Sequence, residues 1–195
     1  HHQDYCGRAC QAHSRQGIIM KPTRSFITVY GISPEDAKDF SFDYDTSSAA
    51  IGSDDLMEQL VPNNGSWGDI GWMELEDYEY EEENRTMLMT IETKWEPPTE
   101  WARVASRDCP YFQNRLITMS TIARDECWVE GNAFMDGEPL QNKRLLNLES
   151  SEVFKYYDEE NEEDEVDDLD ALMWDAINKF EQVCRDFYLG EENNG

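Results

Sequence analysis

The stretch 94–138 constrains the fold of this chain most strongly, because its local sequence signals agree with one another. Leading into it, residues 86–95 alternate between apolar and polar side chains, which predicts a strand. Two prolines end that strand, and residues 99–107 then carry apolar side chains at helical spacing until Pro110 follows. The residues of this predicted helix that we expect to be buried are Trp101, Val104 and Ala105.

Two further strands are predicted directly after this helix. Residues 111–122 and 126–135 both alternate, and the second segment closes on the Asp-Gly-Glu sequence at 136–138, which is typical of a tight turn. We expect Cys127, Val129 and Ala133 to lie on the buried side of the second strand. Beyond the turn, residues 144–148 predict only one short strand.

The first half of the chain predicts another strand–helix–strand unit. Residues 25–30 are rich in β-branched and aromatic side chains, which predicts a first strand. Ser33 is followed by Pro34 and two acids, which predicts a short helix with Ser33 as its N-cap. Residues 73–80 alternate and precede a charged segment, which predicts a β-hairpin with residues 86–95. The chain therefore predicts an α+β fold, with helices packed on one face of an antiparallel sheet.

A C-terminal amphipathic helix is predicted over residues 167–189. Its apolar side chains are separated by three or four residues, which places them on one face. They are Val166, Leu169, Met173, Ile177, Phe180, Cys184 and Phe187. We expect this stripe to pack on the sheet as part of the core, and the alternative is an interface with a partner protein.

Three regions are expected along the 195 residues. Residues 1–19 begin with two histidines and are mildly basic, so we expect a tag-derived or disordered leader. Residues 20–150 are expected to form the α+β domain, and residues 151–195 an acidic segment and a C-terminal helix packed on it. The odd number of cysteines, five, fits a reducing compartment, and no stretch is long enough to span a membrane, so we expect a cytoplasmic protein.

Several short motifs within residues 25–140 resemble the Api92/YubB family. They are Val29-Tyr30-Gly31, Phe40-Ser41-Phe42, Trp95 with Pro97-Pro98, and Asp136-Gly137-Glu138. Members of that family come from phages, plasmids and other mobile elements and carry a ferredoxin-like domain, so the resemblance implies a ferredoxin-like sheet and a bacterial host. The chain departs from the family pattern at Glu96, where a small residue is usual, and near Trp72. The resemblance implies no settled activity, so function has to be argued from the site or surface.

Acidic residues dominate the charge of the chain, with 43 Asp and Glu against 16 Lys and Arg and a net charge of −27. Such a surface repels nucleic acid and anionic membranes and attracts basic partners. The acids are densest in residues 74–83 and 158–170, and in the second segment ten of thirteen positions are acidic. The residues that we expect to contact a basic partner are Glu74, Glu76, Asp77, Glu79, Glu81, Glu82, Glu83, Asp158, Glu159, Glu160, Glu162, Glu163, Asp164, Glu165, Asp167 and Asp168.

The sequence offers no evident catalytic or metal site. All three histidines lie in the leader, which removes the commonest general base and metal ligand from the predicted domain. Cys6, Cys10 and His13 make a set one ligand short of a structural zinc site, and no P-loop or zinc-protease motif occurs. A catalytic pair of carboxylates is the one enzyme class left open by so many acids. We therefore expect a protein that is not an enzyme and needs no cofactor or metal.

Two functions fit this sequence. The first is an acidic binding protein of a mobile element that mimics nucleic acid and inhibits a host nuclease or other DNA- or RNA-handling protein, because a rigid row of carboxylates fits a groove made for phosphates. The alternative is a structural or regulatory protein-interaction module whose acidity serves solubility only. Neither function involves direct binding to nucleic acid or to a membrane.

Overall fold

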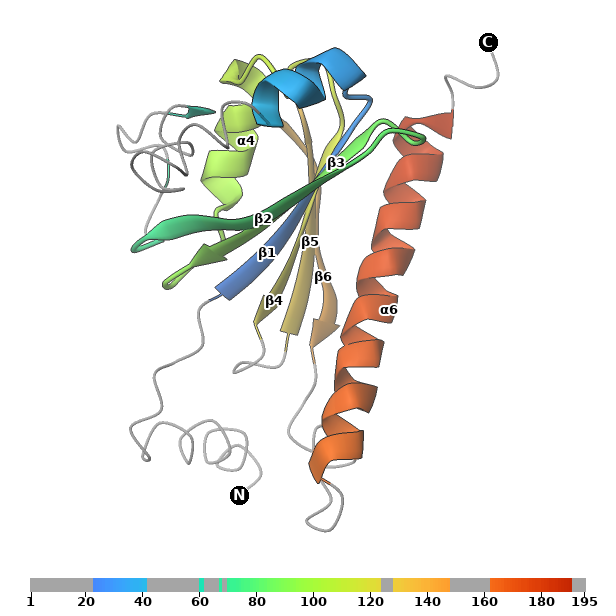
Figure 1. Cartoon of the computed structure of the whole chain (residues 1–195). Coiled ribbons are helices and arrows are strands. Elements are labelled where there is room, and N and C mark those ends of the chain that lie inside the picture. Colours follow the sequence, from blue (N-terminus) through green and yellow to red (C-terminus); the bar gives the residue numbers. More distant parts are fainter. Residues whose placement is uncertain are drawn as a thin grey trace. The chain divides into compact units, whose positions relative to one another are not determined.

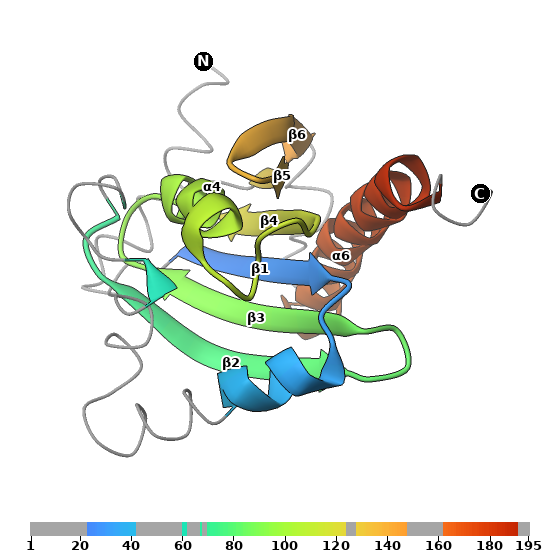
Figure 2. The same ribbon diagram turned by 90° about the horizontal axis from the view of Figure 1, so that it is seen from above.

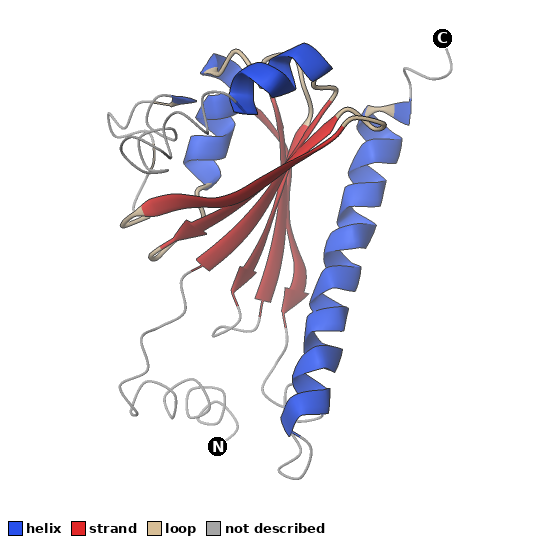
Figure 3. Ribbon diagram, viewed as in Figure 1, coloured by secondary structure: helices blue, strands red, loops and turns tan. Residues whose placement is uncertain are grey.

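The computed structural model describes residues 23–41, 60–61, 67, 70–123, 128–147 and 162–190, and for residues 162–168 it describes the backbone only. Strands and helices occur in both halves of this part of the chain, so the α+β class is confirmed (Figure 3). The elements are β1 (Thr23–Tyr30), a helix over residues 34–41, β2 (Met73–Glu81), β3 (Thr86–Thr93), α4 (Thr99–Asp108), β4 (Ile117–Ala123), β5 (Trp128–Met135), β6 (Glu138–Asn147) and α6 (Glu162–Tyr188) (Figure 1).

The strands form one six-stranded sheet in the order β2-β3-β1-β4-β5-β6. β3 lies between β1 and β2 and pairs antiparallel with both, so the predicted hairpin of β2 and β3 is confirmed. The arrows of β2, β3, β1 and β4 alternate in direction from one strand to the next (Figure 2). The register places Ile27 of β1 opposite Met89 of β3, and this pair belongs to the core.

The core lies between the sheet and the two helices that pack on the same face of it (Figure 2). Alternate residues of β1 and β3 point toward these helices, because successive side chains of a strand face opposite sides. Burying each large apolar side chain stabilises the fold by about 1.5–3 kcal/mol. The core includes the three residues predicted for α4. Its main members are Ile27, Val29, Met87, Met89, Ile91, Ala37, Phe40, Trp101, Val104 and Ala105.

Local capping fixes where the first helix begins. The backbone N–H of Asp36 donates to the Ser33 hydroxyl oxygen at 3.1 Å, so the predicted N-cap is confirmed. Phe40 at the other end of this helix makes edge-to-face contacts with Tyr78 of β2 and Tyr111, at 5.3 and 5.6 Å between ring centroids. The helix is therefore packed against β2 and against the turn that follows α4.

The strand predicted over residues 111–122 is wrong in its first half, because β4 begins only at Ile117. After α4 the chain turns: the N–H groups of Phe112 and Gln113 both donate to the carbonyl of Cys109, at 2.9 and 3.1 Å. Asn114 then adopts a positive φ of 58°, which a strand residue does not.

Arg115 joins this turn to the first strand and helix. Its guanidinium donates to Asp36 at 2.7 Å, to the carbonyl of Gly31 at 3.1 Å, and to the carbonyl of Tyr111. The three acceptors come from three different segments, so one mostly buried side chain fixes their relative positions.

β6 and α6 also differ from their predicted bounds. β6 runs over ten residues from Glu138, whereas the sequence predicted a short strand at 144–148. α6 begins at Glu162 rather than near 167, and its residues Leu169, Met173, Ile177, Phe180 and Cys184 are buried as predicted. Phe187 was predicted to belong to the same stripe, and this is wrong, since it is 68% exposed in the last turn of the helix.

The described chain divides into two compact units. One contains residues Pro22–Thr121 and Gly131–Lys143, and so holds β1 to β3, α4 and most of β4, β5 and β6. The other contains Ile122–Glu130 and the region from Arg144 that includes α6. None of the helices in the described ranges has the length and apolar character required to cross a membrane.

We predict that Arg115→Met lowers the free energy of unfolding by about 2 kcal/mol, because it removes charge-assisted hydrogen bonds to three segments. Chemical denaturation followed by circular dichroism measures the change. Arg107→Met is the matched control, since the exposed guanidinium of Arg107 pairs with its sequence neighbour Asp108, and the unfolding midpoint of this variant should stay nearly unchanged. Equal midpoints for the two variants would contradict the role of Arg115.

Candidate interaction surface on the edge strand

The candidate site is the outward side of β2, which lies at one edge of the sheet. Met73, Leu75, Tyr78 and Tyr80 of this strand turn toward the core, and the residues between them are exposed. The five exposed carboxylates of β2 form a surface that we call the acidic face. They are Glu74, Glu76, Asp77, Glu79 and Glu81.

Tyrosines hold the acidic face to the rest of the domain. The Tyr80 hydroxyl donates to the carbonyl of Ile32 at 2.8 Å, and the Tyr78 ring contacts Phe40. Both tyrosines pack against the core cluster while their strand neighbours Glu79 and Glu81 face solvent. The carboxylates are thus displayed by a strand with fixed register.

A β-bulge brings two acids together within β2. The register of β2 against β3 shifts between Leu75 and Asp77, so Glu76 is the extra residue. Both Glu76 and Asp77 are exposed as a result. The sequence did carry a signal of this bulge, because the apolar positions change phase between Leu75 and Tyr78, three residues apart.

Arg24 of β1 partly neutralises the end of the acidic face. Its guanidinium contacts Glu76 at 3.1 Å and Glu92 of β3 at 2.9 Å, and Glu92 lies opposite both Arg24 and Glu74 in the sheet register. Desolvation, followed by a hydrogen bond with Glu92, raises the pKa of Glu76, although the charge of Arg24 acts in the opposite direction. The hydrogen bond to Glu92 is also the main cause that raises the pKa of Arg24.

The turn after β2 continues the acidic surface. Glu82 and Glu83 are exposed in the turn Glu82–Arg85. The carbonyl of Arg85 accepts hydrogen bonds from the N–H groups of Gly31 and Ile32, at 3.0 and 2.9 Å. The turn is therefore fastened to the end of β1.

The structure brings together all seven acids predicted within residues 74–83. The second predicted acidic segment is different, because Asp158, Glu159 and Glu160 lie outside the described residues. The remaining six predicted acids lie on the backbone of α6, in the range whose side chains are not described. They are Glu162, Glu163, Asp164, Glu165, Asp167 and Asp168.

Two cysteine thiols are candidate nucleophiles among the described residues. Cys109 and Cys184 are both free and buried. Burial raises the pKa of each thiol to about 11, so both are protonated near neutral pH. A protonated thiol is a poor nucleophile, since the thiolate is the reactive form. Within the described ranges, no group of three or more His, Cys, Asp or Glu residues is placed to hold a metal ion.

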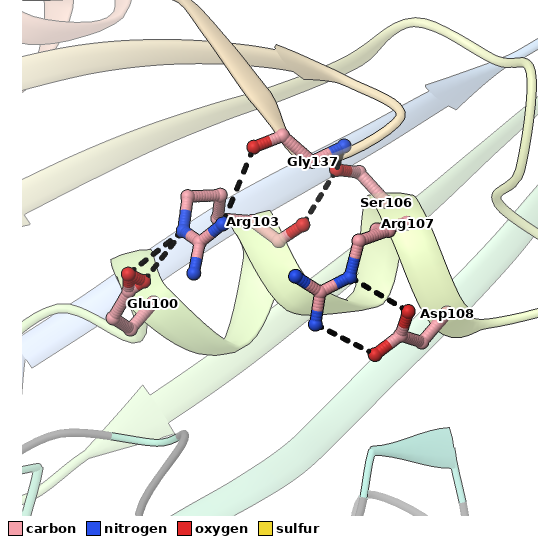
Figure 4. A network of polar contacts seen from close by, with 6 residues as sticks. All are labelled: Glu100, Arg103, Ser106, Arg107, Asp108 and Gly137. Carbon is pink, nitrogen blue, oxygen red and sulfur yellow. Dashed lines mark hydrogen bonds and ion pairs between the residues drawn. The ribbon is translucent and has the colours of Figure 1, made fainter.

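A second polar cluster lies between α4 and the β5–β6 turn (Figure 4). The Ser106 hydroxyl donates to the carbonyl of Arg103 at 2.6 Å and accepts from the N–H of Gly137 at 2.9 Å. Arg103 donates to both carboxylate oxygens of Glu100 at 2.7 Å and to the carbonyl of Gly137 at 3.3 Å. These contacts attach the turn to the helix, so the role of the cluster is structural.

We predict that Gly137→Ala lowers the free energy of unfolding by about 2–3 kcal/mol, from backbone strain plus a clash. Gly137 has φ of 83°, and an added Cβ would lie 3.0 Å from Cβ of Arg107. Gly31→Ala is the matched control, because Gly31 has a similar φ of 81° and no atom within 4 Å of the added Cβ. It should cost about 1 kcal/mol. Thermal and denaturant unfolding compare the two, and equal losses would contradict the close approach to α4.

We also predict that Glu76→Gln changes the pH dependence of stability. A raised folded-state pKa means that the folded protein binds this proton more tightly than the unfolded chain, so the wild type loses stability as pH rises through that pKa. The variant should match the wild type near about pH 3 and exceed it near about pH 7 by roughly half a kcal/mol or less. Denaturation at both pH values measures this.

A control for that prediction is Glu92→Gln, followed by NMR titration of Glu76. Removing the neighbouring carboxylate should lower the Glu76 pKa, because Glu92 raises it both by hydrogen bonding and by charge. A Glu76 pKa that does not change would show that burial alone sets it.

Comparison with the models of known protein families gave no match, and neither did comparison with curated proteins or with solved structures. What this chain does is therefore argued from its own surface.

Proposed function

We propose that this chain is an acidic binding protein whose acidic face imitates the phosphate row of a nucleic acid and occupies the binding groove of a basic protein. The observation that carries the proposal is the row of exposed carboxylates on one fixed edge strand. Alternate residues on a strand are roughly 6.6–6.8 Å apart. That spacing is comparable to the separation of neighbouring phosphates along a DNA strand.

Charge density and rigidity both support this proposal. Residues 73–93, which make up β2, its turn and β3, contain eight acids and one base. Such a concentration of one sign steers an oppositely charged partner during association. Because β2 is paired with β3 and held by Tyr78 and Tyr80, little conformational freedom is lost on binding.

The target class that we propose is a host nuclease or other DNA- or RNA-handling protein in the cytoplasm of a bacterial host. A phage or plasmid gains from inhibiting such a protein, and the Api92/YubB-like motifs near Trp95 and Gly137 suggest a mobile element as the source. In this proposal the chain acts by occupancy, as a non-enzymatic inhibitor that requires no cofactor.

We further propose that the first four strands are a ferredoxin-like domain. The order β2-β3-β1-β4, with a helix between β1 and β2 and α4 between β3 and β4, supports this assignment. On this assignment β5 and β6 are an added hairpin that widens the sheet beyond β4. The added hairpin lies at the opposite edge of the sheet from the acidic face.

The experiment is a pull-down from bacterial lysate at low salt, with the recovered proteins identified by mass spectrometry. The wild type should recover nucleic-acid-binding proteins, and added duplex DNA should compete for them. The acidic-face variant should lose them, because four carboxylates of the row are neutralised. It carries Glu74→Gln, Asp77→Asn, Glu79→Gln and Glu81→Gln.

A matched control variant separates the acidic face from net charge. It removes the same number of exposed carboxylates away from β2, with the substitutions Glu35→Gln, Asp39→Asn, Glu138→Gln and Asp175→Asn. The control should retain the recovered proteins. Equal loss in both variants would favour the alternative, a protein-interaction module whose acidity serves solubility only. Recovery of no nucleic-acid-binding protein by the wild type would contradict the proposed function.

A further inference from the structure

The regular part of the acidic face is one line of carboxylates along one strand. Asp77, Glu79 and Glu81 are alternate residues of β2, so their side chains project from the same face of the sheet. β2 is the outermost strand on its side of the sheet, and it pairs with β3. The line is therefore bounded on one side by the edge of the sheet and on the other by the outward side chains of β3.

The outward side chains next to this line are uncharged. The register places Thr90 of β3 opposite Asp77 and Leu88 opposite Glu79. Residues directly opposite each other on antiparallel strands face the same side of the sheet. Phe26 of β1 lies opposite Thr90 on the next strand. We call Leu88, Thr90 and Phe26 the neutral strip, and all three side chains are partly exposed beside the carboxylates.

The strands next to β2 do not supply a second line of carboxylates. β1 and β3 together contain a single acid, Glu92, which pairs with Arg24 at 2.9 Å. The helix over residues 34–41 carries the exposed acids Glu35 and Asp39, but it packs on the core side of the sheet, away from this face (Figure 2). Within β1, β2 and β3, the negative charge of the outward face therefore runs along β2, with neutral side chains beside it.

One line of charge beside a neutral strip corresponds to a single-stranded nucleic acid. A duplex carries phosphates on both strands, with one line on each side of every groove, and its bases are stacked inside. A single strand presents one phosphate line with its bases accessible next to it. Proteins that bind single strands accordingly combine a basic groove along the backbone with aromatic side chains that stack on the bases.

We propose that the acidic face imitates a single strand, and that the partner is a protein whose groove binds single-stranded nucleic acid. The carboxylates take the positions of the phosphates, and the neutral strip packs against the aromatic side chains of the groove. The nine residues of β2 span about four steps of 6.6–6.8 Å, and single-strand grooves bind from about four nucleotides upward. The inference rests on the proposed function and narrows its target to proteins that bind single strands.

The test is a competition between two nucleic acids in the lysate pull-down at low salt. The proteins that the immobilised full chain retains, and that the acidic-face variant loses, are challenged with oligothymidine or with a blunt-ended duplex at equal phosphate concentration. Oligothymidine should release them at about one-tenth of the concentration that the duplex requires, because base stacking adds to the phosphate contacts. Release by the duplex at an equal or lower concentration would overturn the inference.

Substitutions at Leu88 test the neutral strip. Leu88→Glu adds a carboxylate opposite Glu79, so a partner that recognises charge alone should be retained at least as well as by the wild type. A partner built for a single strand should instead be retained about five-fold less, because its aromatic side chains lose an apolar contact. Leu88→Gln removes the same contact without adding charge, and it should weaken retention in the same direction.

Asn142→Glu is the matched control for added charge, since Asn142 is exposed on β6 at the other edge of the sheet. It should retain the partner as the wild type does. Circular dichroism and thermal unfolding confirm that each variant is folded before retention is compared.

The outcomes separate this inference from the proposed function. Wild-type retention by both Leu88 variants would overturn the role of the neutral strip. More effective release by the duplex would overturn the single-strand assignment and leave the proposed function standing, because the acidic-face variant would still lose a nucleic-acid-binding partner. Recovery of no nucleic-acid-binding protein by the wild type would overturn both proposals.

Discussion

The rest of the structure depends on the pairing of β3 with a strand on each side. β1 and β2 both align antiparallel to it, and this fixes which residues of all three strands face the core. On β3 the buried residues Met87, Met89 and Ile91 alternate with partly exposed ones, which end at Glu92. A shift of one residue would send the methionines to solvent and the carboxylates into the core. The apolar side of the sheet therefore holds the acidic face in position.

The same pairing of β1, β2 and β3 brings several carboxylates close together, and Arg24 neutralises only part of their charge. Arg24 contacts two carboxylates, Glu76 and Glu92. β2 carries four further exposed acids, which are Glu74, Asp77, Glu79 and Glu81. The raised pKa of Glu76 reflects burial together with a second carboxylate close by. A cationic partner would relieve this repulsion, which gives a physical reason for the face to bind rather than to remain solvated.

An edge strand with such charges does not readily pair with another copy of itself, since like charges along an exposed edge oppose strand addition. β2 therefore stays available along its length. The hairpin carries two chemistries, with indoles at the end near Trp95 and carboxylates running toward Glu83 at the turn. In the proposed complex the carboxylates supply attraction to the basic partner over distance.

The sequence by itself determined the elements whose signals are local. β-branched and aromatic composition predicted β1, alternation predicted β2 and β3, helical spacing predicted α4, and Ser33 marked a helix start that the structure confirms. Alternation also placed Glu74 and Glu76 on the exposed side of β2, opposite the buried side chains of Met73 and Leu75. These predictions succeed because the relevant physics acts between residues a few positions apart.

Only the tertiary structure decided the features that depend on distant partners. Residues 111–116 form a turn rather than a strand because Arg115 binds acceptors from other segments, Gly31 among them. β6 extends over ten residues of mostly polar sequence because β5 supplies its hydrogen bonds across the tight turn at Gly137. The exposure of Trp72 and Trp95 was likewise unpredictable, since a large apolar side chain is buried or displayed according to what the rest of the fold places over it.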